Sequence, residues 1–190
     1  MKDIFPILLA AASFVLSIIT LWITQFRRGQ LRMTQPTLLC LNREQPAGTP
    51  KIFLRTLLHT TASKGRVIET MFLRVHQPGG TYVFDFWGHT DGGKLTLGSG
   101  LFVGQAGVAS DHHFNPRHDV RNFLFTDGQY RVEVFTVTVG RSKPKKLMEL
   151  SFCVDGQQAA ELIQITDLEL FLFWNAETRA YEGRLDRPPR

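Results

Sequence analysis

Three histidines and two aspartates fall within the segment 110–119, which reads Ser-Asp-His-His-Phe-Asn-Pro-Arg-His-Asp. The candidate metal ligands are Asp111, His112, His113, His118 and Asp119. Imidazole nitrogens and carboxylate oxygens together suit zinc or another divalent metal. The segment therefore raises the hypothesis of a metal-binding module or a metal-dependent enzyme.

The same segment also has an interpretation without metal. Adjacent side chains of an extended chain point to opposite sides, so His112 and His113 are poorly placed to share one ion. Pro116 and the polar composition favour a surface loop. A further alternative is that one of these two histidines is buried under the domain as a hydrogen-bonded group. We therefore expect no resident cofactor, and a divalent metal is the alternative.

Other segments with chemical potential are weaker. The glycine-rich segment 98–107 lacks Gly-Lys-Ser/Thr, and Ser99 does not stand in Gly-x-Ser-x-Gly, so neither a phosphate loop nor a hydrolase elbow is predicted. A strand bent by glycines and closed by a turn explains it. Cys40 and Cys153 fall on expected strands and are predicted to be buried apolar residues. No residue is predicted to be catalytic.

The formal net charge of +5 is concentrated in two clusters. One follows the apolar amino-terminal stretch (Arg27, Arg28 and Arg32), and the other occupies one short loop (Arg141, Lys143, Lys145 and Lys146). The rest of the chain carries a small net negative charge, so nucleic-acid binding is not expected. Both clusters are candidate contacts for anionic lipid head groups, which a nearby Lys or Arg attracts by about 1 kcal/mol.

The residues 4–26 contain no charged side chain. As a helix they would extend about 34 Å, which is enough to cross the hydrocarbon core of a bilayer. The stretch is too long for the apolar region of a signal peptide, and no small-residue cleavage pattern precedes the arginines. We therefore predict a single-pass transmembrane helix. The arginines after it place the remaining chain in the cytoplasm by the positive-inside rule.

Small and hydroxylated residues recur on one face of this predicted helix. They are Ala10, Ser13, Ser17, Thr20 and Thr24. Such a stripe lets helix backbones approach closely in lipid and predicts self-association or a partner helix. The alternative is that each hydroxyl bonds to a carbonyl in the preceding turn.

Beyond residue 33, short apolar runs are separated by turn residues, which is typical of an all-β domain. Strands are predicted over 37–41, 51–61, 67–76, 81–88, 94–103, 130–139, 147–154 and 168–174. Hairpin turns are predicted at 78–80, 91–93 and 127–128. The apolar set within 131–139 changes parity near Phe135, which predicts a bulge or twist there. The domain's one predicted helix covers 156–163, with Asp155 as its N-cap.

About eight strands at this spacing predict an antiparallel β-sandwich of two sheets. The segment 125–130, which ends in Asp-Gly-Gln-Tyr130, resembles the immunoglobulin-like start of a late strand, where the tyrosine bonds back to the backbone. Val132 stands where that fold often has a cysteine.

The chain as a whole resembles a bacterial family of small single-pass membrane proteins with an immunoglobulin-like β-sandwich. The resemblance rests on the segments 33–37, 53–58, 98–104 and 112–114, and it implies architecture without an activity.

The predicted organisation is a tail (1–3), a transmembrane helix (4–26), a basic linker (27–36), the β-sandwich (37–176) and a C-terminal tail (177–190). With no coherent active-site motif, the leading hypothesis is a membrane-anchored, non-enzymatic module that presents a cytoplasmic domain to a protein partner. Metal binding and anionic-lipid binding are the alternatives.

Overall fold

The computed structural model describes residues 4–26, 29–44, 48–61, 64–98, 100–118, 120, 123–165 and 168–187. The helices are α1 (Ile4–Leu21), continued by a π-helical turn (Trp22–Phe26), and α2 (Gly156–Gln164). The strands are β1 (Leu31–Met33), β2 (Leu38–Glu44), β3 (Thr49–Thr60), β4 (Arg66–Gln77), β5 (Gly80–Asp91), β6 (Lys94–Leu97), β7 (Leu101–Val103), β8 (Val108–Pro116), β9 (Gly128–Thr138), β10 (Lys145–Val154), β11 (Glu169–Asn175) and β12 (Ala180–Asp186).

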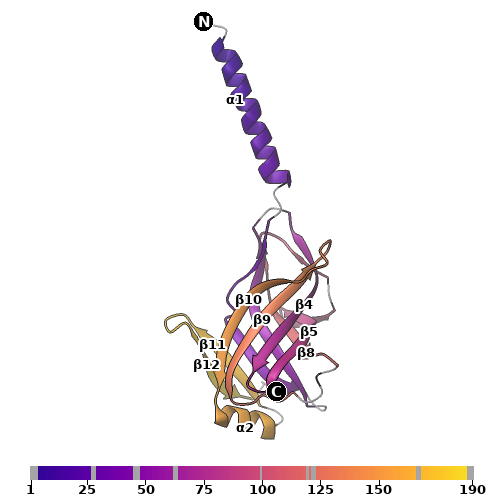
Figure 1. Ribbon diagram of the computed structural model, residues 1–190, viewed down its shortest axis with the longest axis vertical. Coiled ribbons are helices and arrows are strands. Elements are labelled where there is room, and N and C mark those ends of the chain that lie inside the picture. The colour runs from indigo at the N-terminus through magenta and orange to yellow at the C-terminus, as the bar shows by residue number, and fades with distance from the viewer. Residues whose placement is uncertain are drawn as a thin grey trace.

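The amino-terminal helix stands apart from the rest of the chain (Figure 1). The span Ile4–Thr24 has a mean hydropathy of 2.5, and none of it is buried in the protein, so it is long and apolar enough to cross a membrane. Each hydroxyl of the predicted stripe donates to a carbonyl of the preceding turn; Ser17, for example, bonds Ser13 O at 2.8 Å. The hydroxyls are therefore satisfied within the helix, as the alternative interpretation expected.

All the described strands belong to one antiparallel sheet. Nine of them follow the order β10-β9-β4-β5-β8-β3-β2-β11-β12, and β1, β6 and β7 pair with β3, β5 and β4 beside this path. The terminal strands β10 and β12 contact each other, and β1 contacts β10, so the sheet curls into a nearly closed barrel. The prediction of a mostly β domain is confirmed, but the separation into two sheets is wrong. Strands of up to 12 residues coil strongly enough for one sheet to supply both walls of the core.

Three segments predicted to lie outside the strands are part of this sheet. The segment 31–33 of the predicted linker pairs with β3, and 180–186 of the predicted tail pairs with β11. The third is β8, which occupies most of the expected His/Asp surface loop and is paired on both sides, with β3 and β5. The sheet therefore begins before and ends after the predicted domain bounds of 37–176.

Local details of the structure agree better with the predictions from the sequence than the arrangement of the sheet does. The helix α2 begins after Asp155, whose side chain accepts a bond from the Gln158 N–H, as predicted. Hairpins form at 78–80 and 91–93, but 127–128 leads from a coil into β9. The irregularity expected near Phe135 lies on the neighbouring strand, where the register of β10 shifts between Lys146 and Met148. Along β9 itself, the even residues from Tyr130 to Thr138 are all buried.

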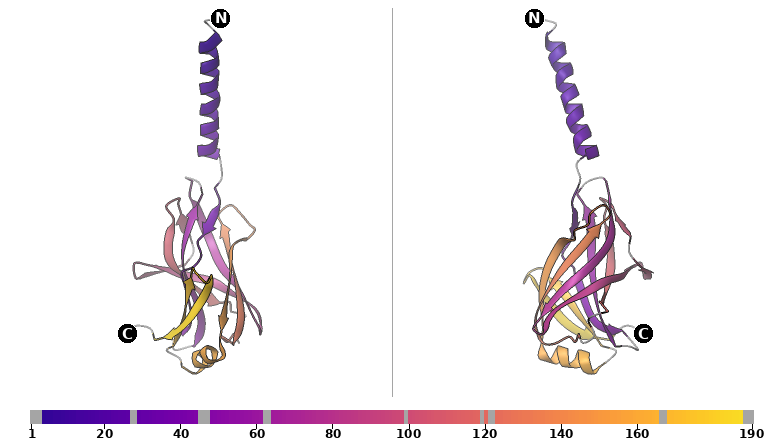
Figure 2. Two further views of the ribbon diagram at one scale, coloured as in Figure 1. Left: turned by 90° about the vertical axis from the view of Figure 1, so that its left-hand side faces the viewer. Right: turned by 45° about the vertical axis from the view of Figure 1, so that its right-hand side comes forward.

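The barrel interior differs between its two ends. The end covered by α2 is aromatic and aliphatic, and there Tyr130 stacks on Phe152 with ring centroids 5.1 Å apart. The Tyr130 hydroxyl donates to the Thr126 carbonyl at 2.8 Å, which confirms the predicted bond back to the backbone. At the opposite end, from which α1 leaves (Figure 2), buried polar residues stand among apolar ones such as Leu31 and Val103. These polar residues are Thr56, Thr60, Ser110, His112, Thr136 and Thr138.

Candidate functional site

The predicted metal ligands diverge because most of them stand on one strand. In β8, His112 points into the barrel and is fully buried, whereas its neighbours Asp111 and His113 point outward. Asp111 forms a bidentate ion pair with Arg55 at 2.6 and 2.8 Å, and His113 Nε2 lies 2.9 Å from the Thr90 hydroxyl. His118 is exposed, and Asp119 lies outside the described residues.

No group of three or more His, Cys, Asp or Glu side chains within the described part of the chain is arranged to hold a metal ion. The interior position of His112 instead matches the alternative of a buried, hydrogen-bonded histidine. Its Nε2 lies 3.3 Å from the Ser110 hydroxyl. Burial, and then the neighbouring His89, lower the pKa of His112 to about 4. Burial also lowers the pKa of His113, with a further contribution from Lys51.

The two cysteines do not share an environment. Cys40 is buried, and its thiol donates to Glu169 at 3.7 Å; burial and the Glu169 carboxylate raise its pKa. Cys153 is exposed on β10, contrary to the prediction that both are buried. It stands at an odd position of that strand, where side chains face the solvent while Phe152 and Val154 face the core.

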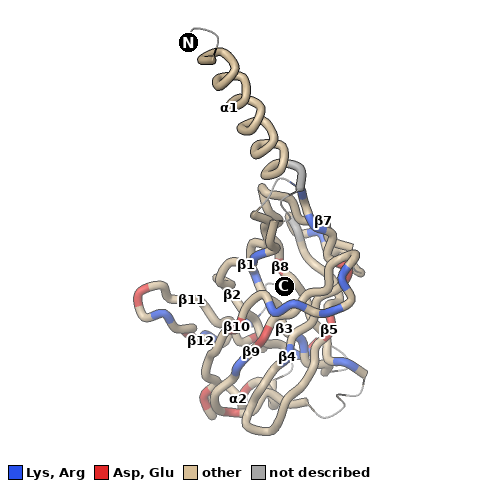
Figure 3. Tube along the Cα trace, turned by 45° about the horizontal axis from the view of Figure 1, so that its top comes forward, with Lys and Arg blue, Asp and Glu red and all other residues tan. Residues whose placement is uncertain are grey.

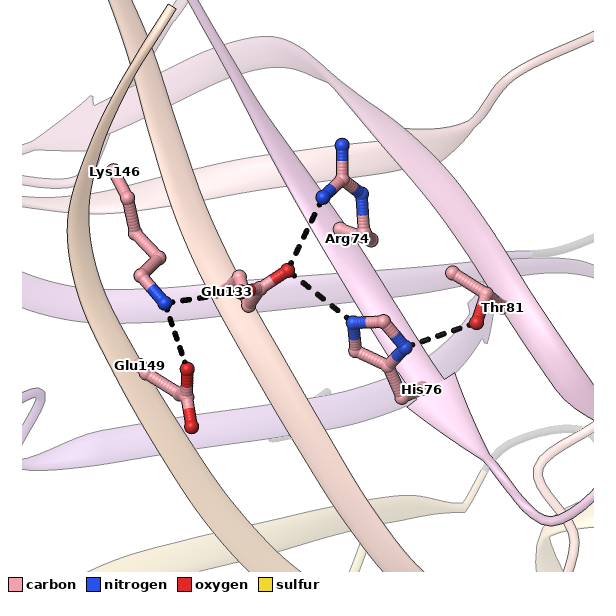
Figure 4. Close-up of polar contacts among 6 residues, drawn as sticks. All are labelled: Arg74, His76, Thr81, Glu133, Lys146 and Glu149. Atoms are coloured by element: carbon pink, nitrogen blue, oxygen red, sulfur yellow. Dashed lines mark hydrogen bonds and ion pairs between the residues drawn. The ribbon is translucent and has the colours of Figure 1, made fainter.

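The basic residues of the predicted lipid contacts separate into three groups. Arg27 and Arg28 lie outside the described residues, and Arg32 is exposed on β1. Lys146 is held on the outer wall of the barrel by two carboxylates, Glu133 at 3.1 Å and Glu149 at 2.8 Å (Figure 4). Lys143 and Lys145 turn to a different place, the open end of the barrel.

Glu133 is the centre of the network that holds Lys146. Its carboxylate also lies 3.2 Å from His76 Nε2 and 3.4 Å from Arg74 (Figure 4). The hydrogen bond from Lys146, followed by that from His76, lowers the pKa of Glu133. This network joins β4, β9 and β10, and it explains why Lys146 contributes less to the open end than its neighbours in sequence.

The open end of the barrel contains a cavity of about 340 Å³, which we call the mouth. Four cationic side chains line it: Arg66, Arg141, Lys143 and Lys145. Its other lining residues are Gly29, Gln30, Leu31, Thr136 and Thr138. Figure 3 shows Lys and Arg gathered around this end of the barrel, near the base of the helix.

Arg66 is the member of the mouth that the sequence interpretation missed. It begins β4, and its guanidinium donates to the Gly29 carbonyl at 2.8 Å. It lies far from both basic clusters in sequence, and the curled sheet brings it beside Arg141, Lys143 and Lys145. In the sequence, Arg66 is distinguished only by its position just before an alternating strand. Many solvent-facing arginines share that position, so it does not predict a binding site.

A second cavity, of about 490 Å³, lies on the outer wall, and we call it the outer groove. Its floor is formed by β3 and β8 and contains the Arg55–Asp111 ion pair. The segment 34–37 forms one wall, and the tip of the β5–β6 hairpin, at Thr90, Gly92 and Gly93, forms another. Ser110 of this lining lies 3.3 Å from Nε2 of the buried His112, which is not among the described lining residues.

In the β5–β6 hairpin, β5 stays paired with β8 as far as Thr90, and the tip of the hairpin projects to the side (Figure 2). Within the described part of the chain, β6 pairs only with β5, and every residue of β6 is exposed. Leu95 and Leu97 are 42% and 59% exposed. Gly88 permits the close pairing of the two strands, because a Cβ there would lie 2.6 Å from the Thr96 carbonyl oxygen.

The fold and these surfaces define the class of protein as an antiparallel β-barrel domain that follows an exposed apolar helix. No family model matches the chain, and no curated protein matches it. A solved structure with a likeness to it is the CooA pilin subunit from enterotoxigenic Escherichia coli. The identity is 13%, the TM-score is 0.33, and the match covers 66% of this chain and 98% of that chain. A TM-score this low does not establish a shared fold, so the description of the barrel rests on its strand pairing.

Proposed function

We propose that this protein is a membrane-anchored, non-enzymatic binding module that presents its barrel to a protein partner through the free edge of β6. The exposed apolar helix supports the anchor, because an uncovered surface of this length is stable in lipid and unfavourable in water. The observation that carries the binding proposal is β6 with its two exposed leucines, because the edge of β6 that faces away from β5 has no described partner strand.

The register of the hairpin shows which groups the free edge offers. Asp91 pairs with Lys94 and His89 with Thr96 across the hairpin, and Gly98 N–H bonds the Trp87 carbonyl at 3.0 Å. Because bonding alternates along an antiparallel pair, the N–H and C=O groups of Leu95 and Leu97 point away from β5. These groups can accept an added strand, and the leucine side chains supply apolar contacts for it.

The structure limits where else a strand could add. The barrel wall closes on itself where β10 meets β1 and β12, so little space remains at that seam. By contrast, β6 is short, exposed and outside the closed path of the barrel. The outer groove beside the hairpin tip supplies a recess with one ion pair and several hydroxyls, which favours recognition of a polar segment next to the added strand.

The orientation of the barrel is part of this proposal. By the positive-inside rule, the arginines after the helix support a cytoplasmic position for the domain. Cys153 is an internal reporter for that prediction, because it is exposed whereas Cys40 is buried. A membrane-impermeant maleimide should label the full chain only after the cells are permeabilised. Labelling in intact cells would place the barrel on the outer side.

The binding proposal is tested by photo-crosslinking from Thr96 in the full chain in its native membranes. We expect a discrete crosslinked product, and we expect Leu95→Pro to abolish it, because proline removes an N–H that no β5 group uses. Leu95→Ala is the matched control, which shortens the same side chain but keeps that N–H, and it should retain the product.

The mass of the product identifies the partner class. A product of twice the mass of the chain indicates a second copy and favours self-association, which the small-residue stripe of the helix also predicted. Absence of a discrete product, or a product unaffected by Leu95→Pro, would contradict binding through the β6 edge.

A further inference from the structure

We propose that the mouth of the barrel binds the phosphate-bearing head group of an anionic membrane lipid. The site is separate from the β6 edge, and it adds a specific ligand to the membrane anchorage in the proposed function. Its geometry is a cavity of about 340 Å³ with four cationic side chains on its lining. A cluster of this kind attracts a phosphate group both by charge and by hydrogen bonds.

The four cations reach the mouth from three separate parts of the barrel. Arg66 comes from the start of β4, whereas Arg141 and Lys143 come from the β9–β10 loop and Lys145 from the start of β10. Among the described residues that line this cavity there is no Asp or Glu. By contrast, Lys146 is one residue further along and is neutralised by Glu133 and Glu149 on the outer wall. The described lining of the mouth is therefore cationic, whereas Lys146 is paired on the outer wall.

The interior side of the mouth adds neutral hydrogen-bonding groups. Thr136 and Thr138 face into the barrel and are 1% and 8% exposed. The Thr136 hydroxyl donates to the Thr70 carbonyl at 3.3 Å, which leaves its lone pairs available as acceptors. A head group with hydroxyls as well as a phosphate, such as phosphoglycerol, matches this combination of cations outside and threonines inside.

The position of the mouth favours a lipid over a free anion. The uncharged stretch ends at Phe26, and Gly29 already lines the mouth. Three residues of extended chain span at most about 11 Å, and the head-group layer of one leaflet is about 5–8 Å thick. If the helix spans the bilayer, the mouth therefore lies against the lipid head groups.

An apolar patch on the same rim supports contact with the bilayer. Val67 and Phe102 are paired across β4 and β7, and Val139 N–H bonds the Val67 carbonyl at 3.0 Å. These three neighbouring side chains face outward, and their exposed fractions are 39%, 62% and 62%. Apolar side chains next to cations are the combination that stabilises a protein surface at a membrane interface.

The first test is a binding titration of the purified full chain in dodecyl maltoside, labelled with a fluorophore at Cys153, which lies on β10 near α2 and away from the mouth. The probes are dioctanoyl-phosphatidylglycerol, dioctanoyl-phosphatidylcholine and inorganic phosphate, and thermophoresis gives their dissociation constants. We expect saturable binding of phosphatidylglycerol that is at least about tenfold tighter than that of either other probe. Higher salt should weaken it.

The variant for this test replaces Arg141, Lys143 and Lys145 with Gln. Each charge near a membrane surface contributes about a fivefold change in affinity, so the triple variant should bind phosphatidylglycerol on the order of 100-fold more weakly. The matched control replaces the exposed Arg131, Arg179 and Arg187, which removes the same charge elsewhere and should change the affinity by less than about threefold. Thermal unfolding of both variants checks that each is folded.

The outcomes separate the sources of the phosphate. Equal affinity for phosphatidylcholine would overturn recognition of an anionic lipid, and equal affinity for inorganic phosphate would overturn the head group as the ligand. Unchanged affinity in the triple variant would overturn the mouth as the site. Because this titration contains no partner protein, its failure leaves the β6 proposal intact, and failure of the crosslinking leaves this one intact.

A second test locates the apolar patch in a bilayer. Phe102→Trp in the full chain, reconstituted in vesicles with brominated phosphatidylglycerol, should show fluorescence quenching beyond that of the parent protein. Leu124→Trp is the matched control, because Leu124 is also exposed but lies beside the β4–β5 hairpin at the other end of the barrel. Equal quenching at the two positions would contradict contact between this rim and the membrane.

Discussion

The buried imidazole of His112 predicts that the barrel loses stability in mild acid. His112 is fully buried, and burial together with His89 lowers its pKa from 6.5 to about 4. As the pH falls below 6.5, the unfolded chain therefore binds a proton at this position that the folded barrel does not. The stability is complete above the unfolded pKa and is lost as the pH falls towards the folded pKa.

The size of this loss follows from the two pKa values. Protonation of His112 in the unfolded chain should lower the free energy of unfolding by about 2 kcal/mol between about pH 7.5 and about pH 5. For a chain of this length, that corresponds to a fall of about 4–8 °C in the melting temperature. In the folded barrel, Asp111 raises the pKa of His112, whereas His89 and His113 lower it further.

The assay is a set of urea titrations of the full chain in dodecyl maltoside between about pH 7.5 and pH 5, followed by the fluorescence of Trp87 and Trp174. His112→Gln removes the titrating group, so its free energy of unfolding should fall by about 2 kcal/mol less than that of the parent protein. His118→Gln, which changes an exposed imidazole, is the control for the substitution. A parallel decline in the parent and His112→Gln proteins would refute the reasoning.

Two further substitutions test contacts that hold the barrel together. Tyr130→Phe removes the hydroxyl that donates to the Thr126 carbonyl, so the free energy of unfolding should fall by about 1 kcal/mol, and thermal unfolding should show a decrease of about 2–4 °C. An unchanged melting temperature would show that the bond contributes nothing. Glu133→Gln should cost about 1 kcal/mol or less at neutral pH, because the network lies on the outer wall. Since the hydrogen bond from Lys146 lowers the pKa of Glu133, the difference from the parent should disappear as the pH falls below about 4.5, and a difference that persists in acid would contradict this.

Local features of the chain were predictable because they depend on neighbours in sequence. The apolar helix follows from an uninterrupted run of uncharged residues, and the N-cap at Asp155 and the bond of Tyr130 follow from groups three or four residues apart. Alternation of apolar residues likewise predicted most of the strands. The alternation pattern did not predict β8, because Pro116 and the polar residues around His112 are typical of a loop.

Alternation reports that one face of a strand is buried, but not which strand lies across the core from it. A sandwich and a barrel give the same pattern, and only the coiling of the long strands decided between them. Alternation along β8, once it is a paired strand, turned the expected metal ligands to opposite faces. Curling of the sheet brought Arg66 beside Arg141, Lys143 and Lys145.

The amino-acid sequence by itself therefore determined the apolar helix, the β character of the remainder and the position of the charges along the chain. The tertiary structure decided which charges meet. Closure of the sheet joins residues more than 70 positions apart in one mouth, whereas a carboxylate on the adjacent strand captures Lys146. The physical reason is that strand pairing and register determine which distant residues become neighbours, and neither can be derived from a short segment of sequence.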